Sequence, residues 1–224
     1  VVGAATRAQI EARAEAGCEI VRMAIPRRVG LDGFGAGCAA SPLPVVADCH
    51  FDARIAIEAA ARGADKLRIN PGNIGGLEAT REVIAAASAA GIPIRIGWNG
   101  GWLEKDILAK YGHVCPEAMV ESALGHIRLL NKFDFDDICV SLKSSSVRTT
   151  MAAYRLLHER TDYPLHLGVT EAGTPSMGMG KSAIGIGGLL CQGIGDTIRV
   201  SLTAGPVEEV RAAKDILSAA GLRQ

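Results

Sequence analysis

The sequence predicts an α/β fold of the (β/α)8 TIM-barrel type that lacks its first strand in this chain. Short aliphatic segments alternate with helical segments seven times along the 224 residues and a last helix follows, which is typical of a parallel sheet. Polar residues follow every strand instead of gathering where the strand order reverses. This distribution favours a barrel over the alternative, a flavodoxin-like or Rossmann sheet.

Four of the strands share a further pattern, a glycine followed four or five residues later by an arginine among aliphatic residues. In the clearest case Leu67 and Ile69 point to one side of the strand, whereas Arg68 and Asn70 point to the other. A single such arginine is ordinarily part of a structural ion pair. Four arginines at the same level of the sheet predict a bound anion, because burying an unpaired charge costs much free energy. The four are Arg22, Arg68, Arg95 and Arg199.

The first half of the chain is expected to open with a helix over residues 6–16, which Thr6 caps and Gly17 ends. Residues 27–41 contain four glycines and no sustained helical period, so we expect a loop or a poor helix there. Asp52 is expected to cap an alanine-rich helix. The other elements of this half are strands over 19–25, 44–47 and 65–70, and a helix over 77–90.

The second half continues the alternation. Residues 174–180 contain glycine and methionine and are expected to form a loop, with a buried helix over 181–192 behind it. Proline stands near the first turn of two predicted helices, at Pro116 and Pro206. The remaining predicted elements are strands over 92–97, 137–142, 165–169 and 197–202, and helices over 103–111 and 147–160.

Composition excludes several classes of protein. The chain has 24 basic and 24 acidic residues, which argues against a nucleic-acid or membrane-surface protein. No apolar run reaches the roughly 18 residues of a membrane span, and no signal peptide is recognised, so we expect a cytoplasmic protein. Six cysteines without a C-x-x-C pair are read as reduced thiols, and their spacing gives little support to a metal or cluster site.

In a barrel the carboxyl ends of the strands form the active site. Guanidinium groups suit phosphate oxygens, and several of them suit a diphosphate. Each residue also has a structural alternative: His50 could be a core histidine that Asp48 orients, Glu171 could pair with an arginine, and Asn99 could form a turn. The candidate residues at the strand ends are Arg22, Asp48, His50, Arg68, Asn70, Arg95, Asn99, Lys143, Ser144, Thr170, Glu171, Arg199 and Ser201.

At these same segments the chain resembles the 4-hydroxy-3-methylbut-2-enyl diphosphate synthase family over nearly its whole length. The motifs that carry the resemblance are 46–51 (VADCHF), 68–75 (RINPGNIG), 103–106 (LEKD), 141–145 (SLKSS), 166–173 (HLGVTEAG), 181–187 (KSAIGIG) and 198–202 (IRVSL). The family reductively opens the ring of 2-C-methyl-D-erythritol 2,4-cyclodiphosphate in non-mevalonate isoprenoid biosynthesis. It holds the diphosphate in a barrel and carries a [4Fe-4S] cluster in a separate C-terminal domain.

The resemblance implies roles for the candidate residues. Glu171 would donate or relay a proton, and Asp48 and His50 would line the sugar-derived part of the substrate. Flavodoxin or ferredoxin would supply electrons, and the full-length protein would be a homodimer. Ser144 and Thr170 are also expected to bind the substrate, with Arg22 nearby. The residues expected to hold the diphosphate are Arg68, Asn70, Arg95, Asn99, Lys143, Arg199 and Ser201.

The chain also departs from the family pattern. Residues 1–224 correspond to the substrate-binding barrel without its first strand, and the cluster domain with its three cysteine ligands is not part of this sequence. Trp98, Trp102, Cys49 and Gly205 replace the residues that are usual at their positions. We therefore expect that this chain alone does not perform the reduction. The alternatives are a diphosphate-binding module without turnover and a pterin- or phosphate-binding barrel of another family.

Overall fold

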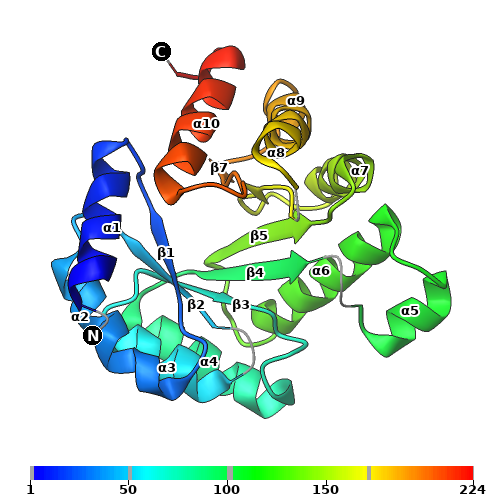
Figure 1. Ribbon diagram of the computed structural model, residues 1–224. Coiled ribbons are helices and arrows are strands. Elements are labelled where there is room, and N and C mark those ends of the chain that lie inside the picture. The colour runs from blue at the N-terminus through cyan, green and yellow to red at the C-terminus, as the bar shows by residue number, and fades with distance from the viewer. Residues whose placement is uncertain (1–2, 50–51, 100–102, 171–172, 224) are drawn as a thin grey trace. The chain divides into compact units, whose positions relative to one another are not determined.

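The computed structural model describes residues 3–49, 52–99, 103–170 and 173–223 and divides the chain into two compact units. Unit 1 comprises Val1–Ile96 and His126–Ile138, and unit 2 comprises Gly97–Gly125 and Cys139–Gln224. Both alternate helices with parallel strands, so the predicted α/β class is confirmed (Figure 1). Within the described residues no helix is both long enough and apolar enough to cross a membrane.

The strands of unit 1 belong to a five-stranded parallel sheet with the order β1-β2-β3-β4-β5. The start of β5 joins within this unit, since the Ile94 amide donates to the Asp137 carbonyl at 2.9 Å. Figure 1 shows α2, α3 and α4 along one face of β1–β3. The elements are α1 (Gly3–Glu15), β1 (Val21–Ala24), η1 (Arg28–Gly30), α2 (Leu31–Ala40), β2 (Val45–Asp48), α3 (Ala53–Ala61), β3 (Lys66–Ile69), α4 (Gly76–Ala90), β4 (Ile94–Asn99) and β5 (Ile138–Lys143), the last two extending into unit 2.

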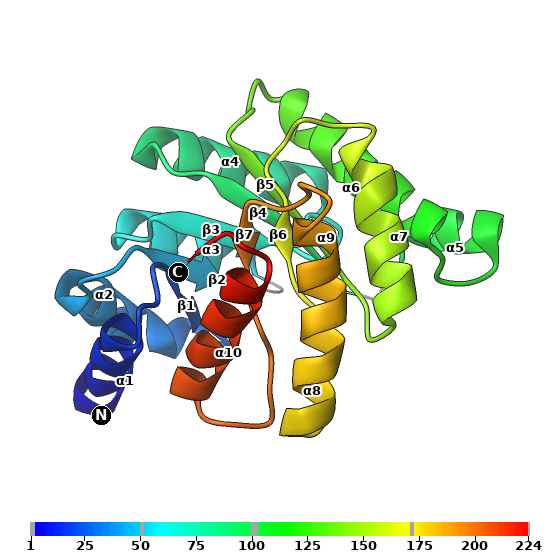
Figure 2. The same cartoon turned by 90° about the horizontal axis from the view of Figure 1, so that it is seen from above.

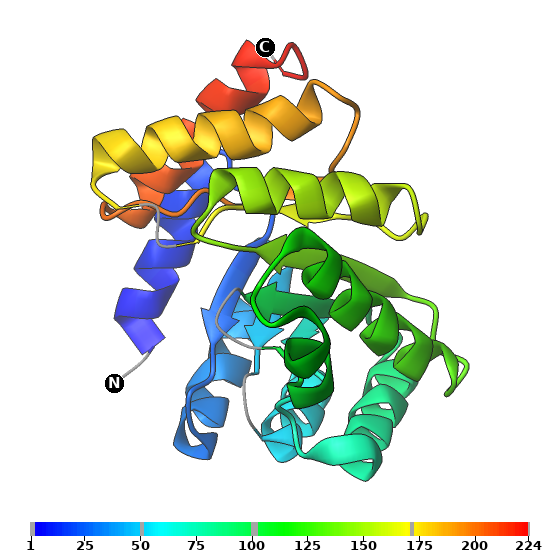
Figure 3. The same cartoon turned by 90° about the vertical axis from the view of Figure 1, so that its right-hand side faces the viewer.

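Unit 2 holds a second pair of parallel strands, β6 (His166–Leu167) and β7 (Thr197–Ile198), and a bridge between Val140 and Leu165 links β5 to β6. Three consecutive helical segments, α8 (Pro175–Ser182), the π-helix η2 (Ala183–Gly187) and α9 (Gly188–Leu190), continue as one rod beside α7 (Figures 2 and 3). The other helices are α5 (Lys105–Tyr111), α6 (Pro116–Asn131, entering unit 1 at His126), α7 (Val147–His158) and α10 (Pro206–Ala219).

Local sequence signals placed several helix ends correctly. The Asp52 side chain accepts from the Arg54 amide at 2.9 Å and caps α3. Gly17 follows α1 with φ +92°, a conformation that glycine adopts without a steric penalty. Pro116 and Pro206 each begin a helix, where the missing N–H costs no hydrogen bond.

Two glycine-containing segments are helical, residues 27–41, which were expected to form a loop or a poor helix, and residues 174–180, which were expected to form a loop. Residues 28–40 form η1 and α2, because Leu31 and Phe34, each 2% exposed, bury a helical face that outweighs the glycines. Residues 175–182 form α8, whose first turn contains Pro175 and is capped by the Thr174 hydroxyl, which accepts from the Met177 amide. The first helix also begins at Gly3 and not at Thr6.

The strand prediction holds for all seven expected segments, although β6 and β7 have only two residues each. Among the described residues β1 ends the five-strand order, and β7 pairs with β6 in the two-strand order. The missing first strand therefore stays a prediction.

Candidate anion-binding site

In unit 1, three candidate residues lie side by side on neighbouring strands: Asp48 ends β2, Arg68 is the last but one residue of β3, and Arg95 is the second residue of β4. The register pairs Asp48 of β2 with Arg68 of β3, and Arg68 with Arg95 of β4. All three are buried, with 1%, 5% and 6% of their surfaces exposed. Because neighbouring residues in register point to the same face of a sheet, two guanidinium groups and one carboxylate share this face.

Both carboxylate oxygens of Asp48 are engaged by arginines. Arg68 Nη1 donates to Oδ1 at 3.0 Å, and Arg22 Nη1 lies 2.8 Å from Oδ2. The Arg22 side chain, 36% exposed, reaches this carboxylate from β1. Charge-assisted hydrogen bonds of this length are roughly twice as strong as neutral ones. Asp48 therefore fixes two guanidinium groups at the carboxyl end of the sheet.

The neighbouring cysteine is held in its protonated form. Cys49 is fully buried, and burial followed by the Asp48 carboxylate raises the pKa of its thiol from 9.0 to about 12, with Arg68 acting in the opposite direction. A metal or cluster ligand must be a thiolate. Cys49 is thus poorly suited to bind metal at neutral pH.

Asn70 shapes the turn that follows β3. Its side-chain oxygen accepts from the Gly72 amide at 3.1 Å, and its carbonyl accepts from the Asn73 amide at 2.9 Å. The side chain is 8% exposed, so it is buried as well as bonded. Turn formation, an ordinary role for asparagine, accounts for these contacts, and contact with substrate stays a prediction.

Unit 2 has its own cation at the end of β5. Lys143 is 7% exposed and the following Ser144 is also 7% exposed. The Ser144 carbonyl accepts from the Thr170 amide at 3.3 Å, and the Ser144 amide donates to Thr150 Oγ1 at 3.2 Å. The Ser144 hydroxyl accepts from the Ser146 amide. These bonds fix the backbone immediately after Lys143.

Gly168, which sequence reasoning did not single out, lies against this lysine. A methyl group at position 168 would lie 2.9 Å from both Cε and Nζ of Lys143 and 3.0 Å from the Arg199 carbonyl oxygen. Glycine inside a strand often marks a close approach of this kind. That signal was present in the segment 166–173 and could have identified the residue.

Some of the remaining candidate residues lie within the part of the chain that the structure describes, and others lie outside it. Thr170, Arg199 and Ser201 are half-buried and follow β6 and β7 in unit 2. Asn99 ends β4, but its side chain lies outside what the structure describes, and His50 and Glu171 are outside the described residues. Sequence reasoning thus gave the cations of both units, and the structure brings together Arg22, Asp48 and Arg68 by direct contact.

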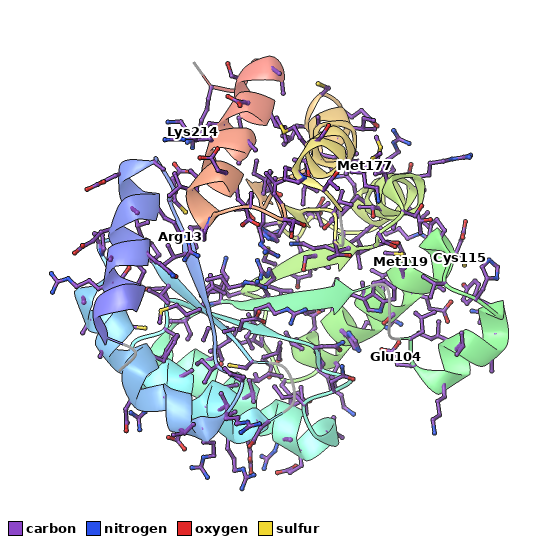
Figure 4. All side chains as sticks on the ribbon, viewed as in Figure 1. Arg13, Glu104, Cys115, Met119, Met177 and Lys214 are labelled. Carbon is purple, nitrogen blue, oxygen red and sulfur yellow. The ribbon has the colours of Figure 1, made fainter. Side chains whose placement is uncertain are left out.

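The acidic residue of the segment 103–106 has a structural contact. The Glu104 carboxylate accepts from the Ser122 hydroxyl at 2.8 and 3.0 Å, which ties the segment before α5 to α6 (Figure 4). Ser122 is 1% exposed. The contact therefore gives the buried hydroxyl on α6 its hydrogen-bond acceptor.

No three His, Cys, Asp or Glu side chains within the described ranges form a group that could hold a metal ion. Together with the protonated thiol of Cys49, this means that the described residues do not fit an iron–sulfur cluster. The prediction that cluster ligands lie outside this chain remains untested.

Comparison with known families identifies a specific match. The GcpE TIM-barrel domain matches residues 3–214, which supports the barrel class. The chain is 56% identical over 220 residues to the 4-hydroxy-3-methylbut-2-en-1-yl diphosphate synthase (flavodoxin) of Geobacter sulfurreducens, covering 98% of this chain and 62% of the relative. It is 55% identical over 219 residues to the enzyme of the same name from Maridesulfovibrio salexigens, covering 98% and 61%. The chain thus spans about three fifths of the length of these relatives.

Solved structures show the same fold at low sequence identity. A truncated 3-deoxy-D-arabino-heptulosonate 7-phosphate synthase from Thermotoga maritima has a TM-score of 0.67 and 13% identity, covering 97% of this chain and 83% of that chain. The dihydropteroate synthase of Yersinia pestis has a TM-score of 0.64 and 14% identity, covering 96% and 87%. At this identity the likeness supports the fold alone.

Proposed function

Because the chain belongs to the GcpE TIM-barrel family, we propose that it is the diphosphate-binding part of a 4-hydroxy-3-methylbut-2-enyl diphosphate synthase. The reaction is the reductive ring opening of 2-C-methyl-D-erythritol 2,4-cyclodiphosphate in isoprenoid biosynthesis. Relatives that are more than half identical over nearly the whole chain support this assignment. They disfavour a pterin- or phosphate-binding barrel of another family.

The observation that carries the proposal is the buried row of Asp48, Arg68 and Arg95 in unit 1. With Arg22, this row carries three guanidinium groups and one carboxylate. A diphosphate presents several anionic oxygens, which suit the planar guanidinium groups of such a row.

The residues proposed to bind the diphosphate are Arg68, Asn70, Arg95, Asn99, Lys143, Arg199 and Ser201. Ser144 and Thr170 support Lys143 through the backbone contact between them. His50 lines the sugar-derived part of the substrate, and Glu171 supplies a proton to the departing oxygen. Asp48 acts mainly through the two arginines that it holds, because both of its oxygens are engaged by them.

The reduction itself needs groups outside the described residues. The name of the relatives supports flavodoxin as electron donor. We further propose that a [4Fe-4S] cluster belongs to the full-length protein, that this protein is a cytoplasmic homodimer, and that residues 1–224 alone bind the substrate without turning it over.

Calorimetric titration of the purified chain with inorganic pyrophosphate tests the anion site. A charge-assisted hydrogen bond contributes about 1.5–3 kcal/mol, so Arg68→Ala should weaken binding by about tenfold or more. Arg211→Ala is the control, because Arg211 is exposed and pairs with Glu208, three residues away on the same helix, at 2.8 Å. Equal dissociation constants for the two variants would contradict the proposed anion site.

A further inference from the structure

We propose that Gly168 is a positioning residue of the anion site: its missing side chain leaves the space in which the end of the Lys143 side chain lies. This inference rests on the proposed function, since the anion is the diphosphate proposed above. The role differs from that of a binding residue, because Gly168 would act only through the ammonium group of Lys143.

The contact geometry supports the proposal directly. A methyl group at position 168 would lie 2.9 Å from Cε and 2.9 Å from Nζ of Lys143, well inside van der Waals contact. The lysine is 7% exposed, so its side chain is confined by the protein around it. The ammonium group therefore lies against the backbone of residue 168, in space that any side chain at this position would occupy.

The backbone at Gly168 has little freedom to move away. On one side, the Arg199 amide donates to the Leu167 carbonyl at 2.9 Å. On the other side, the Thr170 amide donates to the Ser144 carbonyl at 3.3 Å. The Arg199 carbonyl oxygen, 3.0 Å from the added methyl, is also backbone and resists displacement. Of the three neighbouring atoms, only those at the flexible end of Lys143 can yield.

A displaced ammonium group binds phosphate less well. Lysine contributes a compact charge whose hydrogen bonds to anionic oxygens are about 2.7–2.9 Å long. A shift of about 1 Å is enough to break such a bond or replace it with a water-mediated contact. Gly168→Ala should therefore impair anion binding while retaining the charge of the lysine.

A double-mutant cycle tests this coupling. The variants are Gly168→Ala, Lys143→Ala and the double variant, each titrated with inorganic pyrophosphate by calorimetry. We expect Gly168→Ala to weaken binding by about tenfold, which is one charge-assisted bond. In the Lys143→Ala background the same glycine substitution should have no further effect, because the group through which it acts is absent.

The matched control is Gly180→Ala on α8. Among the described residues, no heavy atom other than those of its chain neighbours and its own helix backbone lies within 4 Å of a methyl group added at position 180, and alanine is a better helix former than glycine. This variant should bind pyrophosphate as the wild type does. Additive losses from Gly168→Ala and Lys143→Ala, or unchanged affinity of Gly168→Ala, would overturn the inference.

Unfolding measurements on the same variants provide a readout without ligand. Removing the lysine side chain relieves the two 2.9 Å contacts of the added methyl group and leaves its 3.0 Å approach to the Arg199 carbonyl oxygen. Gly168→Ala should therefore destabilise the wild type more than it destabilises Lys143→Ala. If Gly168→Ala does not fold but the double variant does, this coupling is confirmed. If the glycine substitution lowers the free energy of unfolding equally in both backgrounds, the inference is wrong.

Absence of pyrophosphate binding by the wild type would instead refute the proposed function. The unfolding measurements would still decide whether Gly168 positions Lys143.

Discussion

Cations in the two units have different surroundings. In unit 1, Arg68 and Arg22 are fixed by opposite charge, because both donate to the same buried carboxylate of Asp48. In unit 2, the end of Lys143 lies in space that Gly168 leaves empty. In unit 1 the ion pairs orient the guanidinium groups through directional hydrogen bonds. In unit 2 the absence of a side chain at residue 168 lets the lysine side chain approach the backbone closely. The first arrangement should be sensitive to loss of charge and the second to added volume.

The largest expected effect is on the ion-paired cluster of unit 1. Asp48→Ala removes the carboxylate from two arginines, one of them 5% exposed, and should lower the free energy of unfolding by about 3–5 kcal/mol. Denaturant unfolding measures this loss. Glu78→Ala is the control, since Glu78 pairs with Arg81 on the exposed surface of α4, and its unfolding midpoint should not change. A midpoint for Asp48→Ala equal to that of the control would show that charge does not hold this cluster.

The next largest effect is expected from added volume in unit 2. Gly195 has φ +114°, and a methyl group there would overlap the fully buried side chain of Leu167. Left-handed strain and overpacking together should lower the free energy of unfolding of Gly195→Ala by about 2–4 kcal/mol.

Gly193→Ala separates strain from overlap. Gly193 has φ +75°, but apart from its chain neighbours no described residue lies within 4 Å of an added methyl group, so only the strain of about 1–2 kcal/mol should remain. Both variants are compared by thermal and denaturant unfolding. Equal losses would mean that the close approach to Leu167 contributes nothing.

The smallest effect is a pH dependence in unit 1. The pKa of Cys49 is about 12 in the folded protein, above the value of 9.0 that we assign to the unfolded chain. Since the folded state favours the protonated thiol, this contribution to stability is complete below about pH 9 and is lost as the pH rises toward 12. The loss should be about 1 kcal/mol at pH 10.

Unfolding at pH 8 and pH 10 measures this difference. Cys49→Ala should lose less stability over the interval than the wild type, whereas Cys191→Ala, which changes an exposed thiol, should behave as the wild type does. An identical pH response in all three proteins would show that the Cys49 thiol does not couple to alkaline unfolding.

The sequence by itself determined the order of helices and strands and the residue types at the strand ends. These follow from local chemistry: alternating aliphatic residues, Asp52 as a cap, and prolines at the starts of α6 and α10. It did not give α2 or α8, because glycine-rich segments have poor intrinsic helix propensity. The first of these helices forms because Leu31 and Phe34 are buried by packing against other elements. The second begins at a cap, the Thr174 hydroxyl, which accepts from the Met177 amide.

Only the tertiary structure decided how the candidate residues meet. Arg22 and Arg68 share Asp48 because the register of β1, β2 and β3 brings residues 20 or more positions apart into contact. The same holds for Gly168 and Lys143, which are 25 residues apart in the sequence and meet across β5 and β6. Strand register depends on long-range pairing and on the packing of both faces of the sheet, and no local sequence pattern specifies those distances.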